Sequence, residues 1–430
     1  MSLYQNHDVT EYLEKVCDQV KCKEIHPALK SELLNHIEER SEDLLAQGVP
    51  PEEAIRQAVK DMGDPVSVGK QLHQTHKPKT DWWLLLFTAL FLGFGLFTLY
   101  TIQFNNLLTY DLGVFYKSIF YAVLGGALLI LVSRIDYRKF QPISAYVYVF
   151  TIGIWILTLL DGPSVAGLPY LVVGPFSINI AAISPYLLTI ALAGLLVKCD
   201  WNDRKSLIKG GILFIIPVLL YIASPCLSGL LLFTSAFFVL MLLSRAKYWQ
   251  IAAIMAFPVL TTLLAVISHP YRLQRFTIFL NPQVDPSGAG YLYIKITEVL
   301  KAAGLFGQGF NLSVLPELHT DFVFTYIVYT FGWLAGILFF FLVVGFLVHL
   351  FKTAKIVRNE YGSLLIAGLS TLLLVQTLWH ILMNLGWLPI TGMSLPFISY
   401  GGSQLVVQML ALGMILAAYR LKDIVLLTNK

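Results

Sequence analysis

Ten apolar stretches fill most of the chain after residue 81, and their lengths constrain the fold more than any other feature. They lie at residues 82–104, 114–133, 142–160, 180–197, 208–223, 226–243, 249–268, 322–350, 362–385 and 398–419. A helix of about 20 apolar residues crosses a bilayer core of about 30 Å, and it satisfies its own backbone hydrogen bonds in lipid. The sequence therefore predicts an all-α, polytopic membrane protein with ten transmembrane helices. The fifth stretch is short and the eighth is long, which favours a broken or re-entrant helix near residues 217–225 and a tilted eighth helix.

The first 81 residues differ in composition from the rest. Charged residues make up only 13% of the whole chain, about half the fraction of a typical soluble domain, yet 15 of the 26 acidic residues lie at positions 1–81. Pro27, Pro50 and Pro65 each lie at the start of a short run with helical spacing. We therefore expect a small cytoplasmic helical domain at 1–81, ahead of a membrane domain at 82–430. Its apolar helix faces would be available to a cytoplasmic protein partner.

Lys and Arg are distributed unevenly among the loops. The loops at 134–141, 198–209, 244–248, 351–361 and 420–430 are basic, whereas those at 105–113, 161–179 and 386–397 contain no Lys or Arg. Basic loops face the cytoplasm, so both termini are expected there. The long loop at 269–321 is then extracytoplasmic.

Residues 272–321 form a polar segment that is rich in Gly and Pro. A loop of this length is functional or disordered, and its aromatic and aliphatic content argues against disorder. Asp285 lies in its tight Pro- and Gly-containing turn at 281–291. The flanking cations are Arg272, Arg275, Lys295 and Lys301. This pattern suits a base that removes a hydroxyl proton while cations stabilise a departing phosphate group; alternatively, Asp285 only closes the turn.

Three further features contain candidate site residues. At 315–322 (LPELHTDF), Glu317, His319 and Asp321 either bind a metal or mark a capped helix start. Lys117 lies near the outer end of the second apolar stretch. It is either a functional candidate or a lysine whose ammonium group reaches the membrane–water interface. The run at 386–403 breaks helical structure with Pro and Gly beside small hydroxyl groups, as in irregular backbone that lines a cavity. Its candidate residues are Ser399, Tyr400 and Ser403.

These motifs together resemble the SEDS family (shape, elongation, division and sporulation proteins, FtsW/RodA/SpoVE-like) over residues 82–430. The resemblance rests on the 279–291 turn, on LPELHTDF and on the 386–403 run, in that order. It implies a peptidoglycan glycosyltransferase that polymerises lipid II, an undecaprenyl-pyrophosphate-linked precursor, with a class B penicillin-binding protein as its usual partner. It also implies that Asp285 is the catalytic residue. A divalent cation, Mg²⁺ or Mn²⁺, would be one way to stabilise the departing charge. Residues 26–76 resemble a helical prefix domain found ahead of some bacterial permeases.

The chain departs from the family pattern at several polar positions. Tyr329-Thr330 replaces a Glu pair, residues 224–229 lack an acid, residues 168–171 and 182–185 replace two further polar segments, and His380 replaces an Asn. Two alternatives therefore stand beside the polymerase. One is a flippase for lipid-linked precursors, and the other is a catalytically degenerate regulatory or scaffold protein.

Overall fold

The computed structural model describes residues 6–21, 26–75, 79–108, 113–165, 168–174, 176–267, 274, 277–312 and 314–422. Contacts within the chain define two compact units, one comprising Met1–Thr80 with Tyr419–Lys430 and the other Asp81–Ala418. Arg272 and Arg275, two of the predicted cations, lie outside the described residues.

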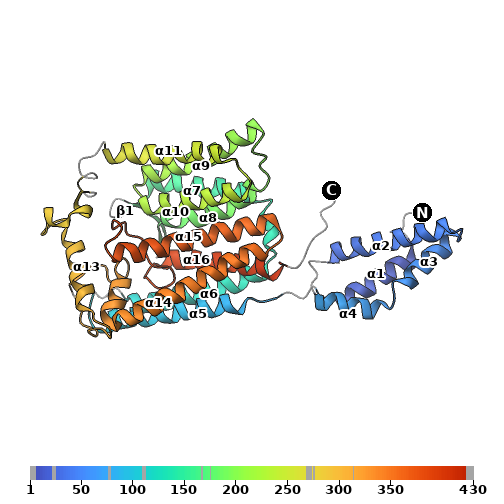
Figure 1. Ribbon diagram of the computed structural model, residues 1–430, viewed down its shortest axis with the longest axis horizontal. Helices are drawn as coiled ribbons and strands as arrows, with labels where there is room; N and C mark the ends of the chain where they lie inside the picture. Colours follow the sequence, from blue (N-terminus) through green and yellow to red (C-terminus); the bar gives the residue numbers. More distant parts are fainter. Residues whose placement is uncertain are drawn as a thin grey trace. The chain divides into compact units, whose positions relative to one another are not determined.

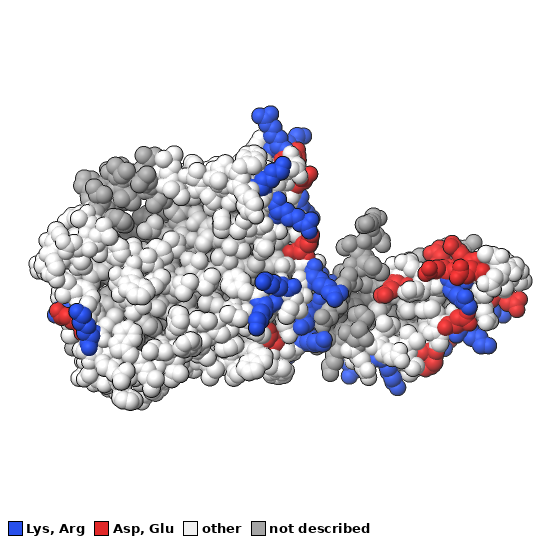
Figure 2. Space-filling view, viewed as in Figure 1, with Lys and Arg blue, Asp and Glu red and all other residues white. Residues whose placement is uncertain are grey.

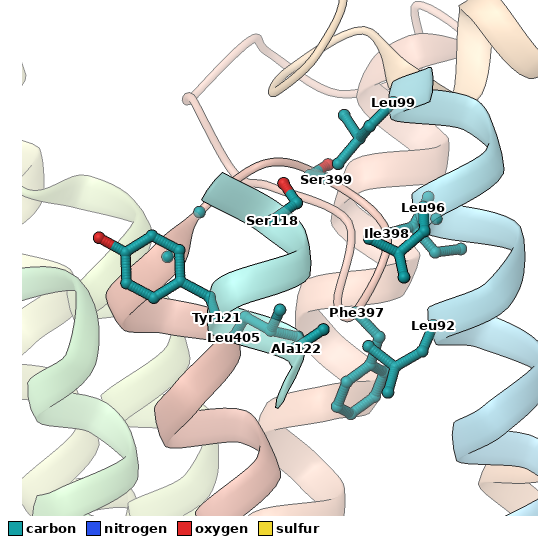
Figure 3. Close-up of a pocket in the computed structure, with 13 residues that line it drawn as sticks. Leu92, Leu96, Leu99, Ser118, Tyr121, Ala122, Phe397, Ile398, Ser399 and Leu405 are labelled. Atoms are coloured by element: carbon teal, nitrogen blue, oxygen red, sulfur yellow. The ribbon is translucent and has the colours of Figure 1, made fainter. Parts of the chain in front are cut away.

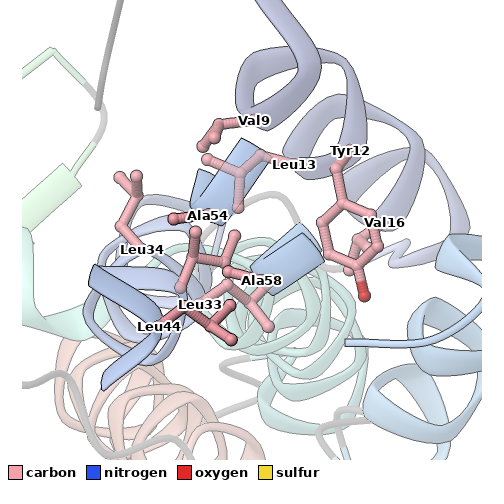
Figure 4. Packing of buried hydrophobic residues seen from close by; sticks show 10 residues of the cluster. Val9, Tyr12, Leu13, Val16, Leu33, Leu34, Leu44, Ala54 and Ala58 are labelled. Carbon is pink, nitrogen blue, oxygen red and sulfur yellow. The ribbon is translucent and has the colours of Figure 1, made fainter. Parts of the chain in front are cut away.

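The described residues of the N-terminal unit form four helices, α1 (His7–Gln19), α2 (His26–Ala46), α3 (Pro51–Asp61) and α4 (Pro65–Thr75). Helix α1 is an addition to the three predicted helix starts. The apolar faces of these helices pack on one another (Figure 4). The buried cluster consists of Val9, Tyr12, Leu13, Val16, Leu33, Leu34, Ile37, Leu44, Ala54 and Ala58. The prediction that these faces are free for a partner was therefore wrong, because they form the core of the unit.

The second unit is a bundle of apolar helices (Figure 1). Seven helices in the described part of the chain are long and apolar enough to cross a membrane: α5 (Trp82–Phe104), α6 (Val114–Arg134), α7 (Ser144–Asp161), α9 (Arg204–Ala223), α14 (Val323–Ile356), α15 (Glu360–Asn384) and α16 (Gly402–Arg420). Three more apolar helices are α8 (Ile180–Leu196), α10 (Leu227–Leu243) and α11 (Tyr248–Ile267). Each of the ten coincides with one predicted apolar stretch, so the predicted all-α polytopic fold is confirmed.

Charged side chains gather at one end of this bundle. Figure 2 shows most of its Lys and Arg side chains there, with a small group of both signs at the opposite end. The basic connections are the ones that join α6 to α7 through η3 (Tyr137–Phe140), α8 to α9, α10 to α11 and α14 to α15. The alternation of basic and neutral loops in the sequence thus corresponds to the two ends of the bundle.

The helix break lies in a different place from the one predicted. Helix α9 runs continuously through Pro217 to Ala223, and α10 starts as a separate helix at Leu227. The break is in α14, where Gly332 has φ 87° and ψ 168°. Only glycine adopts this backbone conformation readily. The long eighth stretch is therefore two helical segments joined at Gly332.

The neutral end of the bundle contains the remaining ordered elements. Two short antiparallel hairpins lie between α7 and α8, formed by β1 (Ser164–Val165) with β2 (Leu168–Pro169) and by β3 (Leu171–Val173) with β4 (Phe176–Ile178). The long polar segment contains η4 (Pro282–Val284) and α13 (Tyr291–Ala302). Figure 1 shows α13 running across the ends of the membrane helices. The segment therefore carries its own secondary structure.

Candidate active site

Asp285 closes the turn between η4 and α13. Its Oδ1 accepts the N–H of Gly288 at 3.1 Å, and its Oδ2 accepts the N–H of Ala289 at 3.0 Å. The turn excludes side chains at its glycines, because a Cβ on Gly290 would overlap the Pro282 carbonyl oxygen. The turn-closing interpretation is thus correct as a description of geometry. A half-buried carboxylate held from behind by two N–H groups is also pre-positioned for a substrate.

Helix α13 separates the cations that the sequence placed together. The Lys295 ammonium bonds to Glu298 Oε2 at 2.7 Å, so its charge is already paired. Lys301 lies in the last turn of α13, whereas Asp285 lies just before its first turn. Ten residues of helix between Tyr291 and Lys301 span about 15 Å. Lys301 therefore lies about 15 Å along the helix axis from the turn that contains Asp285.

The LPELHTDF segment and the 386–403 run are joined by hydrogen bonds. The Tyr400 N–H donates to the His319 carbonyl at 2.7 Å, and the Ser399 hydroxyl donates to the Thr320 carbonyl at 2.7 Å. Ser399 also accepts the N–H of Leu395 at 2.8 Å. The candidate residues His319, Ser399 and Tyr400 thus lie where these two irregular segments are hydrogen-bonded to each other. Ser403 lies in the first turn of α16, and Lys117 is exposed in the first turn of α6.

The sequence drew attention to Asp321 as a metal ligand or as part of a capped helix start, and the structure gives it no capping hydrogen bond. Helix α14 has Phe322 as its N-cap, with no side-chain hydrogen bond there. The Asp321 carbonyl accepts the amide of Asn384 at 2.9 Å, and a Cβ on Gly392 would lie 3.7 Å from Asp321 Oδ2. Burial, with a smaller contribution from Glu317, raises the pKa of Asp321 to about 6. Burial also lowers the pKa of His319, against the opposing charge of Glu317.

Asn384 is the residue that the sequence analysis missed. It is fully buried at the end of α15. Its side-chain oxygen accepts the Thr325 hydroxyl at 2.6 Å, and its amide donates to the carbonyls of Asp321 and His380. An amide inside an apolar stretch is the signal that points to such a role. Asn384 thereby fixes the start of α14 relative to α15.

Replacement of Asp321 by asparagine is expected to change how stability depends on pH. A carboxyl whose pKa is raised on folding stabilises the folded state most when it is protonated, and this contribution is lost as pH rises through the folded-state pKa. Between about pH 4 and pH 6 the wild type should lose up to about 3 kcal/mol relative to Asp321→Asn, with no further divergence above that window. Thermal unfolding of both proteins across this range measures the difference. Parallel pH profiles would show that Asp321 is not buried as described.

The described residues do not provide a metal site made of protein side chains alone. No three His, Cys, Asp or Glu side chains gather closely enough to hold an ion in the described ranges. The Nε2 atom of His319 lies 3.8 Å from Glu317 Oε2, and its Nδ1 is buried without a hydrogen-bond partner there. Glu317, His319 and Asp321 thus form no three-ligand cluster by themselves in the described residues, and the proposed reaction is derived without Mg²⁺ or Mn²⁺.

A buried polar network holds the 386–403 run within the bundle. The Tyr186 hydroxyl donates to Gln376 Oε1 at 2.7 Å, and the Gln376 amide donates to the Ser394 carbonyl at 2.9 Å. Gln408 Oε1 accepts the N–H of Phe397 at 3.2 Å. The irregular backbone is therefore satisfied by protein groups, as lipid surroundings require.

A narrow crevice lies beside this run, between α5 and α6. Its free space is about 10 Å³, about the room that one water needs. Figure 3 shows Ser118 and Ser399 toward one end of the crevice and Leu92 and Phe397 toward the other. In this conformation the crevice does not hold a sugar or a lipid chain.

Several departures from the family pattern have local partners. The Tyr329 hydroxyl donates to Asn311 Oδ1 at 3.1 Å. Ser224 accepts the indole N–H of Trp155 at 3.0 Å. His380 is fully buried, with Nδ1 2.7 Å from the Met393 carbonyl oxygen. Each of these residues therefore has a hydrogen-bond partner within the chain.

Comparison with known proteins supports the resemblance drawn from the motifs. The cell cycle protein family FtsW/RodA/SpoVE matches residues 81–423. The chain is 30% identical over 360 residues to the probable peptidoglycan glycosyltransferase FtsW of Coxiella burnetii, covering 78% of this chain and 95% of that protein. It is 31% identical over 314 residues to the protein of the same name from Escherichia coli O6:H1, covering 69% of this chain and 74% of that protein. The chain therefore belongs to the FtsW/RodA/SpoVE family.

Two solved structures share the fold. One is a chain of a peptidoglycan synthase complex that coordinates polymerization and crosslinking; its TM-score is 0.69 at 24% identity, covering 79% of this chain and 98% of that chain. The other is the rod shape determining protein RodA of Thermus thermophilus. Its TM-score is 0.60 at 22% identity, covering 80% of this chain and 97% of that chain. The likeness shows a shared fold over about four-fifths of the chain. The family match and the apolar helices together show a multi-pass membrane protein.

Proposed function

We propose that this protein is a peptidoglycan glycosyltransferase that polymerises lipid II, with Asp285 as the base. The observation that carries the proposal is the Asp285 turn, a carboxylate held by two backbone N–H groups at the neutral end of the bundle. Family membership supports it, since relatives that match most of the chain bear the name of this enzyme.

The reaction needs one base and a stable leaving group. The acceptor sugar hydroxyl attacks the anomeric carbon of the lipid-linked donor, a new C–O bond forms, and the bond from that carbon to the pyrophosphate oxygen breaks. Asp285 takes the hydroxyl proton, which raises the nucleophilicity of the oxygen. Pyrophosphate departs as an anion, so the second, acidic carboxyl of a glycosidase is unnecessary.

The orientation follows from the charge distribution. This distribution supports an orientation in which the basic end of the bundle faces the cytoplasm, with both termini there and Asp285 at the outer membrane surface. Lipid II would present its sugars at that surface, with its chain among the helices. A class B penicillin-binding protein is the partner we infer, because a structure that shares this fold is part of a synthase complex.

A reconstituted polymerisation assay tests the function and separates it from transport. The full chain in liposomes, with and without a co-reconstituted class B penicillin-binding protein, is supplied with fluorescent lipid II. We expect glycan strands on a gel in at least one of these conditions. Lipid II translocation without polymer would instead support the flippase. The absence of both activities in every condition would support a regulatory or scaffold protein.

A further inference from the structure

A hollow lies between the end of α13 and the break in α14, away from the Asp285 turn. Its volume is about 400 Å³. The lining residues are Thr297, Leu300, Lys301, Gly304, Leu305, Trp333 and Leu385. The lining thus combines apolar side chains, one hydroxyl and one cation.

The cation of this hollow is available to a ligand. Lys301 is exposed, and no acidic side chain among the described residues forms an ion pair with it. The carbonyls near it are occupied, since Leu300 O accepts the indole N–H of Trp333 at 3.1 Å and Ala302 O accepts the Gln308 amide at 2.8 Å. These bonds reduce the competing negative charge at the helix C-terminus. Lys301 is therefore suited to bind an anion from outside the protein.

The hollow opens beside a surface that faces lipid. After Trp333 along α14, the side chains of Leu334, Leu338 and Phe341 follow helical spacing and are 50%, 62% and 64% exposed. On a membrane helix, a face that no protein covers contacts acyl chains. Leu305 and Phe306, at the rim, are 67% and 82% exposed. Trp333 lines the hollow directly before Leu334 in the chain, and indole rings are enriched at membrane–water interfaces.

We propose that this hollow binds the headgroup of an anionic phospholipid, with Lys301 contacting the phosphate and the acyl chains lying along Leu334, Leu338 and Phe341. The alternative occupant, the diphosphate of the lipid-linked substrate, is disfavoured by the length of α13. That helix places Lys301 about 15 Å along its axis from the Asp285 turn. The proposal depends on membrane insertion and not on the polymerase reaction.

A binding titration of the purified full chain tests the site. The protein, in a zwitterionic detergent, is titrated with short-chain phosphatidylglycerol, and tryptophan fluorescence is recorded. Lys301→Gln should raise the Kd about tenfold, the loss of one charge-assisted hydrogen bond. Lys301→Arg should bind within about twofold of wild type, because it keeps the cation. Lys295→Gln is the matched control, since it removes the same charge from the same helix at a paired position, and it should also stay within about twofold.

Two further ligands decide between the possible occupants. Short-chain phosphatidylcholine should bind wild type no more tightly than phosphatidylglycerol binds Lys301→Gln. Undecaprenyl diphosphate should show no loss of affinity in Lys301→Gln. An unchanged phosphatidylglycerol Kd in Lys301→Gln would overturn the proposal. Tighter undecaprenyl diphosphate binding that depends on Lys301 would overturn it in favour of a substrate site. None of these results depends on polymerase activity, so the failure of either proposal is recognisable separately.

Discussion

Replacing Gly332 with alanine should destabilise the membrane unit by about 3 kcal/mol or more. At this position α14 breaks, and the segment 304–309, which begins with a turn, lies against the break. The N–H of Gln308 donates to the Tyr329 carbonyl at 2.8 Å, and the N–H of Trp333 donates to the Gly304 carbonyl at 3.0 Å. The backbone groups that the break releases thus find partners in that segment. A Cβ on Gly332 would overlap the Leu305 carbonyl oxygen and lie 2.6 Å from the Gly307 nitrogen.

Two costs therefore combine in Gly332→Ala. Alanine disfavours φ 87°, which costs about 1–3 kcal/mol, and the added methyl group meets rigid backbone instead of a flexible side chain. Gly126→Ala in α6 is the control, because a Cβ there has nothing within 4 Å. Thermal unfolding in detergent should show a large loss for Gly332→Ala and little change for Gly126→Ala. Equal unfolding temperatures for the two variants would contradict the described contact between segment 304–309 and α14.

Replacing Asp285 with asparagine should reduce the polymerisation rate about 10²- to 10⁴-fold, the range for removal of a general base. Asparagine has nearly the same shape and keeps one acceptor oxygen for the turn, but it cannot take up the proton. The loss of the second turn hydrogen bond should cost about 1 kcal/mol of stability. Val284→Ala, at the neighbouring position where the side chain is 62% exposed, is the matched control and should retain activity. A rate for Asp285→Asn within tenfold of Val284→Ala would remove Asp285 as the base.

The sequence predicted features that depend on local pattern. Hydrophobic length identified ten apolar helices in the described residues, seven of them long enough to cross a membrane, and Pro and Gly around Asp285 identified its turn. Gly332 escaped prediction because a glycine in a membrane helix is unremarkable by itself. Its break becomes evident only when residues 304–309, more than twenty positions earlier, lie beside it.

The candidate site shows the same difference between features that local sequence predicts and features that depend on contacts between distant segments. Asp321 gains its raised pKa mainly from burial, with a smaller contribution from Glu317, and this burial arises where segments distant in sequence, such as the one with Gly392, lie beside it. Lys301 was assigned to the Asp285 site because it is near in sequence. The regular rise of α13 then separates the two, which is the reason that we propose a separate site around Lys301.

The sharpest test of Asp285 as the base is a paired measurement of lipid II binding and polymerisation on the same preparation of Asp285→Asn. A base acts on the bound substrate, so the variant should bind lipid II within about twofold of wild type while forming glycan strands at least 10²-fold more slowly. Unchanged strand formation would contradict a catalytic role for this carboxylate. Loss of lipid II binding in parallel with loss of polymer would show that Asp285 serves to shape the turn alone.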